Sequence, residues 1–275
     1  MGRVANPARG LLHSLTPFST TAIARNNRTM HDFFMPQVNS RLNLGAKDER
    51  KHTIVDLALR QFDEDGKNKG QKPDGRFFNE LLSNLKAFVF AGHDTTASSI
   101  CWMFKNLEEK PETLARMREE HNEILGPDVD KAHEVILKSP HLLYALPYTL
   151  AVIKETLRMY PLISSLREGR SDFHLTIPGT SFQYPTYGFA MWDGAQVIQM
   201  RSDIWPRGLE FLPERWLAPA VDPLHPPKEA WRPFAAGPRT CIGQELAVTE
   251  LRLVAVLVAR KFDIQQAWRE WDAEK

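Results

Sequence analysis

The sequence predicts a mainly α-helical fold with a small β-sheet, and three observations support this prediction. A long, largely apolar stretch over residues 77–107 has the length and pattern of one helix that crosses a core. Shorter segments on both sides of it also repeat apolar residues at helical spacing. Residues 205–231, in contrast, are rich in Pro and Trp and have no period, which indicates an ordered meander with buried aromatic side chains.

The segment before the long helix contains two shorter helices and a loop. Residues 29–41 and 51–62 have the pattern of short helices. Residues 63–75 combine Glu, Asp, Lys, Gly and Pro in close succession. Such a composition predicts a flexible, solvated surface loop.

After the long helix, the chain is first helical and then mixed. Residues 111–125 form a charged amphipathic helix that a Gly-Pro pair ends, and residues 148–160 form another helix that Pro161 closes. Residues 175–180 and 195–200 are predicted to be short strands between turns. Together these segments give a helical protein with a small sheet.

Composition excludes several classes of protein. The 275 residues carry a net charge of +1, with 43% hydrophobic and 25% charged residues, which suits a globular enzyme of one or two domains and gives no electrostatic case for nucleic-acid binding. Two cysteines, Cys101 and Cys241, cannot form a disulfide framework and suit a reducing compartment. No uninterrupted apolar run reaches the roughly 18 residues of a membrane span. The first thirty residues, which are rich in Arg, Ser and Thr, have the composition of a transit peptide. The alternative is that residue 1 lies in the middle of a longer protein.

Residues 234–243, Phe-Ala-Ala-Gly-Pro-Arg-Thr-Cys-Ile-Gly, are the most informative segment. Gly237 permits a tight turn and Pro238 stiffens it, so the loop can hold a sulfur in place. Gly243 precedes an apolar segment over residues 244–260 with helical spacing. Cys241 therefore lies at a helix N-terminus, where the helix dipole favours a thiolate. The alternative is a buried structural cysteine, which is the usual environment of a lone Cys.

This loop resembles the proximal loop of the cytochrome P450 haem-thiolate monooxygenases, Phe-x-x-Gly-x-Arg-x-Cys-x-Gly, at every fixed position. The resemblance implies that Cys241 is the axial ligand of the iron of haem b. It also implies that Arg239 pairs with a haem propionate, that Phe234 shields the sulfur and that Gly243 lets the macrocycle approach. The thiolate would donate electron density to the iron and favour O–O cleavage.

A second motif, Ala-Gly-His-Asp-Thr-Thr over residues 91–96, lies within the long helix. Glycine and paired threonines weaken a helix interior, so we expect a local kink or notch there. The same family has this motif on its distal helix. By resemblance, Thr95 holds dioxygen through hydrogen bonds, Asp94 relays protons, and Ala91 and Gly92 leave room above the iron. The alternative for Asp94 or Thr95 is a helix N-cap.

A third pattern is structural in character. Glu155 and Arg158 are three residues apart, so both lie on one face of a helix, and Arg215 follows in a Pro-Glu-Arg-Trp segment. In the family these three types of residue form a buried Glu-Arg-Arg network that fixes the meander. Arg167, in the strand region, matches a position where the family often has another propionate partner.

The resemblance also implies partners and a substrate. Two electrons would come from an NADPH-dependent flavoprotein reductase, and Arg232 and Arg252 are candidate contacts for it. The motif variants look most like filamentous-fungal members of secondary metabolism, which points to a small apolar substrate such as a polyketide, terpenoid or alkaloid. Full-length relatives are expected in the endoplasmic reticulum membrane, but these residues contain no predicted membrane anchor.

We expect residues 1–275 to form a single incomplete haem-binding domain, because family members normally have further helices before the distal helix and a hairpin after the last one. The predicted activity is insertion of one oxygen atom of dioxygen into an apolar organic substrate. Two alternatives remain at this stage. One is a non-catalytic, truncated remnant. The other is a haem-thiolate isomerase or dehydratase, against which Asp94 and Thr95 argue, since that chemistry needs no proton relay to oxygen.

Overall fold

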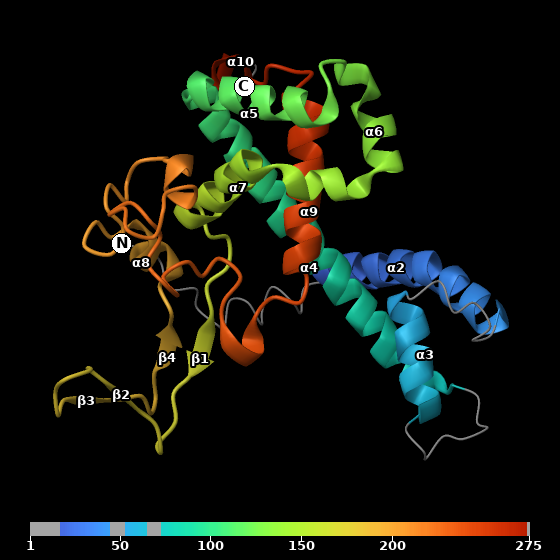
Figure 1. Ribbon diagram of the computed structural model, residues 1–275. Coiled ribbons are helices and arrows are strands. Elements are labelled where there is room, and N and C mark those ends of the chain that lie inside the picture. The colour runs from blue at the N-terminus through green and yellow to red at the C-terminus, as the bar shows by residue number, and fades with distance from the viewer. Residues whose placement is uncertain (1–16, 45–52, 65–72, 274–275) are drawn as a thin grey trace. The chain divides into compact units, whose positions relative to one another are not determined.

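The computed structural model describes residues 17–44, 53–64 and 73–273, and is mainly helical with two small sheets (Figure 1). The chain divides into two compact units, residues 1–91 and residues 92–275. Helix α4 (Gly75–Glu109) contributes residues to both. The prediction that residues 1–275 form one incomplete domain stays a prediction.

The first unit contains helices α2 (Pro17–Leu44), α3 (Ile54–Glu64) and the beginning of α4. Its small core is formed by Val38, Leu81 and Leu85, with partly buried aromatic side chains around them. Helix α2 is longer than the sequence predicted, and it contains Pro36.

Local capping explains where α3 and α4 begin. Thr53 and Asp56 cap α3 reciprocally: the Asp56 amide donates to Thr53 Oγ1 at 3.2 Å, and the Thr53 amide donates to Asp56 Oδ2 at 2.9 Å. The carboxylate of Asp74 accepts a hydrogen bond from the Phe77 amide at 2.9 Å at the start of α4. The loop predicted over residues 63–75 is therefore too long at both ends, and its residues 65–72 lie outside the described part.

Helix α4 is helical at every residue from Gly75 to Glu109, which confirms the predicted long helix. The motif of residues 91–96 does not interrupt it. In the second unit, Met103 and Leu107 of this helix are buried in the main core.

The second unit is built around helix α7 (Pro147–Met159). It packs against α5 (Pro111–Leu125), α8 (Ala195–Met200), α9 (Gln244–Val254) and the 3₁₀ turn η4 (Pro213–Trp216) (Figure 1). Helix α7 is almost entirely buried from Tyr148 to Met159, because it has neighbours on every side. Further short helices are η2 (Val129–Lys131), α6 (Ala132–Lys138), η3 (Pro140–Ala145) and α10 (Trp268–Ala273).

The last long helix changes its winding midway. The sequence predicted one helix over residues 244–260, whereas α9 ends at Val254 and continues as a π-helix over Ala255–Ala259. Its buried side is formed by Leu251, Ala255, Val256 and Ala259. Leu246, an apolar residue near the start of the helix, is instead exposed.

Two antiparallel ribbons form the β-structure. Strand β1 (Leu166–Glu168) pairs with β4 (Ala190–Trp192), and β2 (His174–Thr176) pairs with β3 (Gln183–Pro185). The strand predicted over residues 175–180 is thus confined to its first two residues. The remaining residues begin the turn that leads to β3.

The strand predicted over residues 195–200 is wrong, because this segment is helix α8. Gly194, with φ of 56°, turns the chain into the helix, and the Ile198 amide then donates to the Gly194 carbonyl at 3.2 Å. Ala195 and Gln199, four residues apart, are buried while the residues between them are exposed. Burial at a spacing of four is helical, and a six-residue apolar run gives no periodicity long enough to separate a strand from a helix.

The predicted meander is confirmed. Between α8 and residue 231 only the short turn η4 is regular, yet Trp205 is fully buried. Trp205, Trp216, Trp231 and Phe234 form a series of adjacent rings with centroids 5.6–6.0 Å apart. Across the described ranges, none of the helices has both the length and the hydropathy that crossing a membrane requires.

A buried polar cluster fixes the start of α7. The Glu120 carboxylate of α5 accepts hydrogen bonds from the backbone amides of Tyr148 and Thr149 at 2.6 and 2.8 Å, and from the Thr149 hydroxyl at 2.7 Å. The ring of His121 lies 2.7 Å from the same hydroxyl oxygen. Because that hydroxyl already donates to Glu120, His121 Nε2–H must donate to it. Burial, together with the nearby positive charge of Arg260, lowers the pKa of His121 to about 4.

This cluster predicts an acid-sensitive fold. His121 has an ordinary pKa near 6.5 when unfolded, so the unfolded state binds the proton first, and stability falls as the pH drops from about 6.5 towards 4. Between pH 7 and 4.5 the wild-type chain should lose about 2 kcal/mol more unfolding free energy than His121→Gln, which keeps a donor without titrating. Urea unfolding at both pH values measures this difference. Parallel pH curves for the two proteins would contradict the prediction.

Candidate functional site

The cysteine loop is held by its own backbone. The Cys241 amide donates to the Phe234 carbonyl at 2.9 Å, which closes the loop across seven residues. Within it, the short turn η5 (Gly237–Arg239) begins at Gly237, whose φ is 71°. The Thr240 amide and hydroxyl both donate to the Gly237 carbonyl, at 3.0 and 2.8 Å. A glycine is required there because residues with a Cβ avoid positive φ.

The loop also contains a backbone feature that the sequence did not indicate. Ala235 has a φ of 60°, which is uncommon for a residue with a Cβ and costs free energy. Its amide donates to the Arg232 carbonyl at 3.2 Å, which ties the start of the loop to the residues that precede it.

Cys241 lies at the surface of this loop, two residues before Gly243 caps the start of α9. The alternative of a buried structural cysteine is therefore wrong. Ile242 and Leu246, which follow Cys241 closely in the sequence, are 88% and 74% exposed, so this part of the chain presents apolar side chains at its surface. Arg239 is also exposed. Phe234, in contrast, is half-buried and packs against the main core.

These residues fit a haem group. A haem would need a donor atom for its iron and apolar surface for the macrocycle, and Cys241 with the exposed Ile242 and Leu246 would offer both. A Cβ added at Gly243 would lie 3.9 Å from Cys241 Sγ, so a side chain there would occupy space directly beside the sulfur. Arg239 supplies a cation for a carboxylate on the edge of such a group.

The second motif lies in the middle of α4. Asp94 is exposed and Thr95 is half-buried, both well inside the helix, so the alternative that either is a helix N-cap is wrong. One turn further along, the Ser99 hydroxyl donates to the Thr95 carbonyl at 3.0 Å. Gly92 and Ala91 are exposed, and a Cβ added at Gly92 would meet no atom within 4 Å.

The main hydrophobic core joins α4 to the cysteine side of the second unit. Ile100, Met103 and Phe104 from α4 belong to the same cluster as Phe234 and Leu251. This shared core means that the residues that follow Thr95 on the helix and those that flank Cys241 are parts of one packed body.

The third group forms a buried charge network. Arg158 donates from Nε and Nη2 to the two oxygens of the Glu155 carboxylate, both at 2.9 Å. Arg215 donates from Nε to Glu155 Oε1 at 3.0 Å. All three side chains are 0% exposed. The carboxylate also accepts from the Leu212 amide and from Trp216 Nε1, both at 3.0 Å, so it holds two ends of the η4 turn.

The two arginines donate their other hydrogen bonds to backbone carbonyls of helix α8 and of the meander. Five such bonds, between 2.6 and 3.3 Å, reach carbonyls of Gln199, Pro206, Arg207, Gly208 and Glu210. The chain thus wraps around the two guanidinium groups. Gly208 has no room for a side chain, since an added Cβ would lie 2.7 Å from the Met200 carbonyl oxygen.

A further connection between α7, α5 and the meander was not foreseen from the sequence. Glu214 accepts from the Tyr148 hydroxyl at 2.9 Å and from Arg116 Nη1 at 3.0 Å. The Arg116 guanidinium lies 4.1 Å from the centre of the Tyr148 ring. Burial and the hydrogen bond to Glu214 raise the pKa of Tyr148 to about 12. The sequence gives no sign of these contacts, because Tyr148 and Arg116 lie 66 and 98 residues before Glu214.

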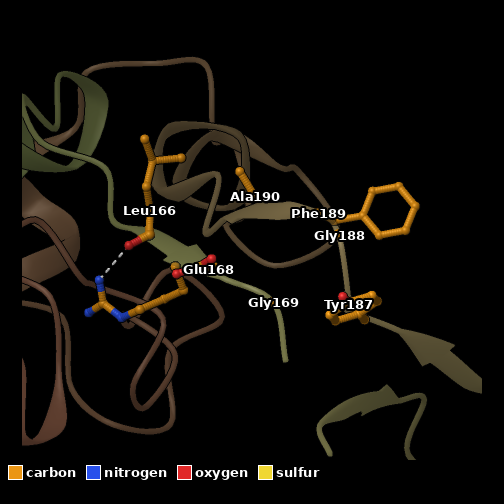
Figure 2. A pocket seen from close by; sticks show the side chains of 8 residues that line it. Leu166, Glu168, Gly169, Tyr187, Gly188, Phe189 and Ala190 are labelled. Atoms are coloured by element: carbon orange, nitrogen blue, oxygen red, sulfur yellow. Dashed lines mark hydrogen bonds between the residues drawn. The ribbon is translucent and has the colours of Figure 1, made fainter. Parts of the chain in front are cut away.

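Arg167 lies apart from the cysteine loop in sequence and is exposed in strand β1. Its Nη1 donates to the neighbouring Leu166 carbonyl at 2.8 Å. It lines an open hollow of about 520 Å³ between β1 and β4. Figure 2 shows Leu166 and Glu168 on one side of this hollow and the rings of Tyr187 and Phe189 on the other.

The two candidate contacts for a partner differ in exposure. Arg232 is exposed. Arg252 is only 7% exposed, with its guanidinium 4.8 Å from the centre of the Tyr144 ring. The expectation that Arg252 offers a surface contact is therefore wrong. Its long side chain packs into the protein, as arginine stems often do.

Comparison with known proteins identifies the family. The model of the family "Cytochrome P450" matches residues 11–272. Cytochrome P450 monooxygenase polC of Polytolypa hystricis is 42% identical over 214 residues, which covers 75% of this chain and 38% of that protein. Cytochrome P450 monooxygenase acrF of Aspergillus aculeatus is 34% identical over 271 residues, covering 88% and 52%. The human ultra-long-chain fatty acid omega-hydroxylase is 31% identical over 270 residues, covering 95% and 44%.

The chain therefore belongs to the cytochrome P450 family, whose members hold a haem iron through a cysteine thiolate. It spans roughly two fifths to one half of the length of these curated relatives.

The buried network predicts a large loss of stability when its centre is neutralised. Glu155→Gln would leave two buried guanidinium groups without an anion, which should lower the unfolding free energy by about 3–5 kcal/mol. Chemical denaturation followed by tryptophan fluorescence measures it. As a matched control, Glu210→Gln removes an exposed carboxylate that pairs with Arg207 at the surface and should leave the midpoint unchanged. Equal effects of the two substitutions would contradict the role of Glu155.

Proposed function

We propose that this protein is a haem-dependent monooxygenase that inserts one atom of dioxygen into an apolar organic substrate and releases the other as water. The observation that carries the proposal is the exposed thiol of Cys241, at the end of a hydrogen-bonded loop and directly before helix α9, in a chain of the cytochrome P450 family. Because the chain spans only part of its relatives, the activity is a proposal for the whole protein.

The residues of the cysteine loop would bind and orient the haem. Cys241 would hold the haem iron, and its thiolate would supply the electron donation that favours oxygen activation. Arg239 would pair with a propionate, and Gly243 would leave space beside the sulfur. Phe234 would shield the sulfur from water, and its packing against the core supports that assignment. Arg167 is the proposed second propionate partner, from strand β1.

The residues of α4 would handle oxygen and protons. Thr95 would donate a hydrogen bond to dioxygen, and the exposed carboxylate of Asp94 would deliver protons from solvent. Ala91 and Gly92 would leave room for the small ligand, which the open space around Gly92 supports. A relay of this kind serves oxygen cleavage, so it favours a monooxygenase over a haem-thiolate isomerase.

The finer assignments concern the partner and the substrate. Electrons would come from an NADPH-dependent flavoprotein reductase, with Arg232 as the remaining candidate contact. Two relatives, polC and acrF, are fungal monooxygenases, which supports a role in secondary metabolism with a small apolar substrate. The human relative is named as a fatty acid hydroxylase, and it supports an apolar substrate in the same way.

The ligand assignment predicts a spectroscopic loss. Cys241→Ser should abolish the strongly red-shifted Soret band of the reduced, carbon-monoxide-treated protein, because a hydroxyl donates far less electron density to iron than a thiolate. The matched control is Cys101→Ser, which changes the other exposed cysteine and should keep the band. Cys101 lies on helix α4. An unchanged band in Cys241→Ser would overturn the assignment. A wild-type chain that never develops the band would instead support a non-catalytic remnant.

The oxygen-handling role predicts uncoupling. Thr95→Ala in the haem-loaded protein, supplied with a reductase and NADPH, should keep haem and substrate binding but divert electrons to hydrogen peroxide, because the hydrogen-bond donor is lost. Thr95→Ser keeps the hydroxyl and should keep coupling. The ratio of product formed to NADPH consumed, with peroxide measured in parallel, reports the effect. Wild-type coupling in Thr95→Ala would reject this role.

A further inference from the structure

Gln199 has a fully buried amide in the short helix α8, where neighbouring residues are exposed. Its Nε2 donates to the Arg158 carbonyl at 3.0 Å, and its Oε1 accepts from the Arg232 amide at 2.6 Å. Its own backbone carbonyl accepts from Arg158 Nη1 at 2.6 Å. One side chain thus joins the buried charge network to the segment that enters the cysteine loop.

The connection continues from there to the cysteine by backbone hydrogen bonds. The Arg232 carbonyl accepts from the Ala235 amide at 3.2 Å, and the Phe234 carbonyl accepts from the Cys241 amide at 2.9 Å. Arg232 enters this series through its amide, whose partner is the Gln199 oxygen. The strained turn at Ala235 lies within it. A displacement of the Gln199 side chain would therefore also shift the backbone at Cys241.

The carboxamide of Gln199 satisfies both of its backbone neighbours. A backbone carbonyl can only accept and a backbone amide can only donate, so the side chain needs one donor and one acceptor at its end. This requirement also fixes the orientation of the amide group. A carboxylate would lose the donor, and an apolar side chain would lose both and leave two buried backbone groups unpaired.

We propose that Gln199 is a positioning residue that sets the conformation of the cysteine loop, and so the placement of the Cys241 sulfur, through the Arg232 amide. The importance of that placement rests on the proposed role of Cys241 as iron ligand. The proposed coupling between Gln199 and the cysteine loop does not depend on that role, because it concerns hydrogen bonds within this chain alone.

Hydrogen–deuterium exchange at single-residue resolution tests the proposal on the protein without added ligand. In the wild type the Arg232 amide should be protected. Gln199→Met should speed exchange roughly five- to tenfold at Arg232 and also at Cys241, because a typical hydrogen bond and its dependent turn are lost. Gln196→Met, the same change at an exposed position of the same helix, is the matched control and should alter neither amide. Amides of helix α5 should stay unchanged in both variants.

Gln199→Glu separates positioning from stability. It retains an acceptor for the Arg232 amide, so exchange at Arg232 and Cys241 should remain closer to wild type than in Gln199→Met, whatever the cost in overall stability. An unprotected Arg232 amide in the wild type, or faster exchange at Arg232 without any change at Cys241, would overturn the proposal. If Gln199→Met does not fold, the wild-type protection and Gln199→Glu still decide it.

The red-shifted Soret band distinguishes this proposal from the proposed function. If Cys241→Ser keeps the band, the ligand assignment fails while the exchange result stands. If Cys241→Ser loses the band and Gln199→Met weakens it while Gln196→Met does not, both proposals hold. A band that Gln199→Met leaves intact, with faster exchange at Cys241, would show that the coupling does not reach the sulfur and would overturn its positioning role.

Discussion

The buried carboxylate of Glu155 is the interaction on which the architecture around the cysteine loop depends. It is a lone anion between two guanidinium groups with no exposed surface, so its desolvation is offset only if every oxygen finds partners. Five hydrogen bonds meet this requirement, three from the arginines and two from Leu212 and Trp216. The excess positive charge is then balanced by carbonyl dipoles of the meander. The path of an otherwise irregular segment is thus dictated by where two guanidinium groups need acceptors.

In this arrangement the residues that support the cysteine loop are packed, whereas the cysteine itself is exposed. The rings of Trp205, Trp216 and Trp231 pack in series, and Trp231 also packs against the main core. Within the loop itself, Cys241 and Ile242 are exposed. The proposed role of Cys241 as a ligand requires both properties, because a binding residue has to be held by packed neighbours and also remain accessible. The buried Arg252 fits the same division, since its charge lies within the supporting side rather than on the surface.

Much of the fold and site was predictable where local chemistry decides the outcome. The long helix follows from its apolar length, the position of the cysteine turn from Gly237 and Pro238, and the pairing of Glu155 with Arg158 from their spacing. The failures arise where tertiary contacts decide. Helix α8 was misassigned because six residues carry too little periodicity. The positive φ of Ala235 and the buried amide of Gln199 left no signal, because both depend on segments distant in the sequence.

The chain order of the charge network has a consequence for biosynthesis. Its members lie between Glu155 and Trp216, 61 positions apart, and all of them leave the ribosome before Cys241. The core of the same unit, however, also contains Leu251 and Ala255, which follow the cysteine loop in the chain. Because a domain folds as a unit, the network and the loop can reach their final packing only after helix α9 has been made.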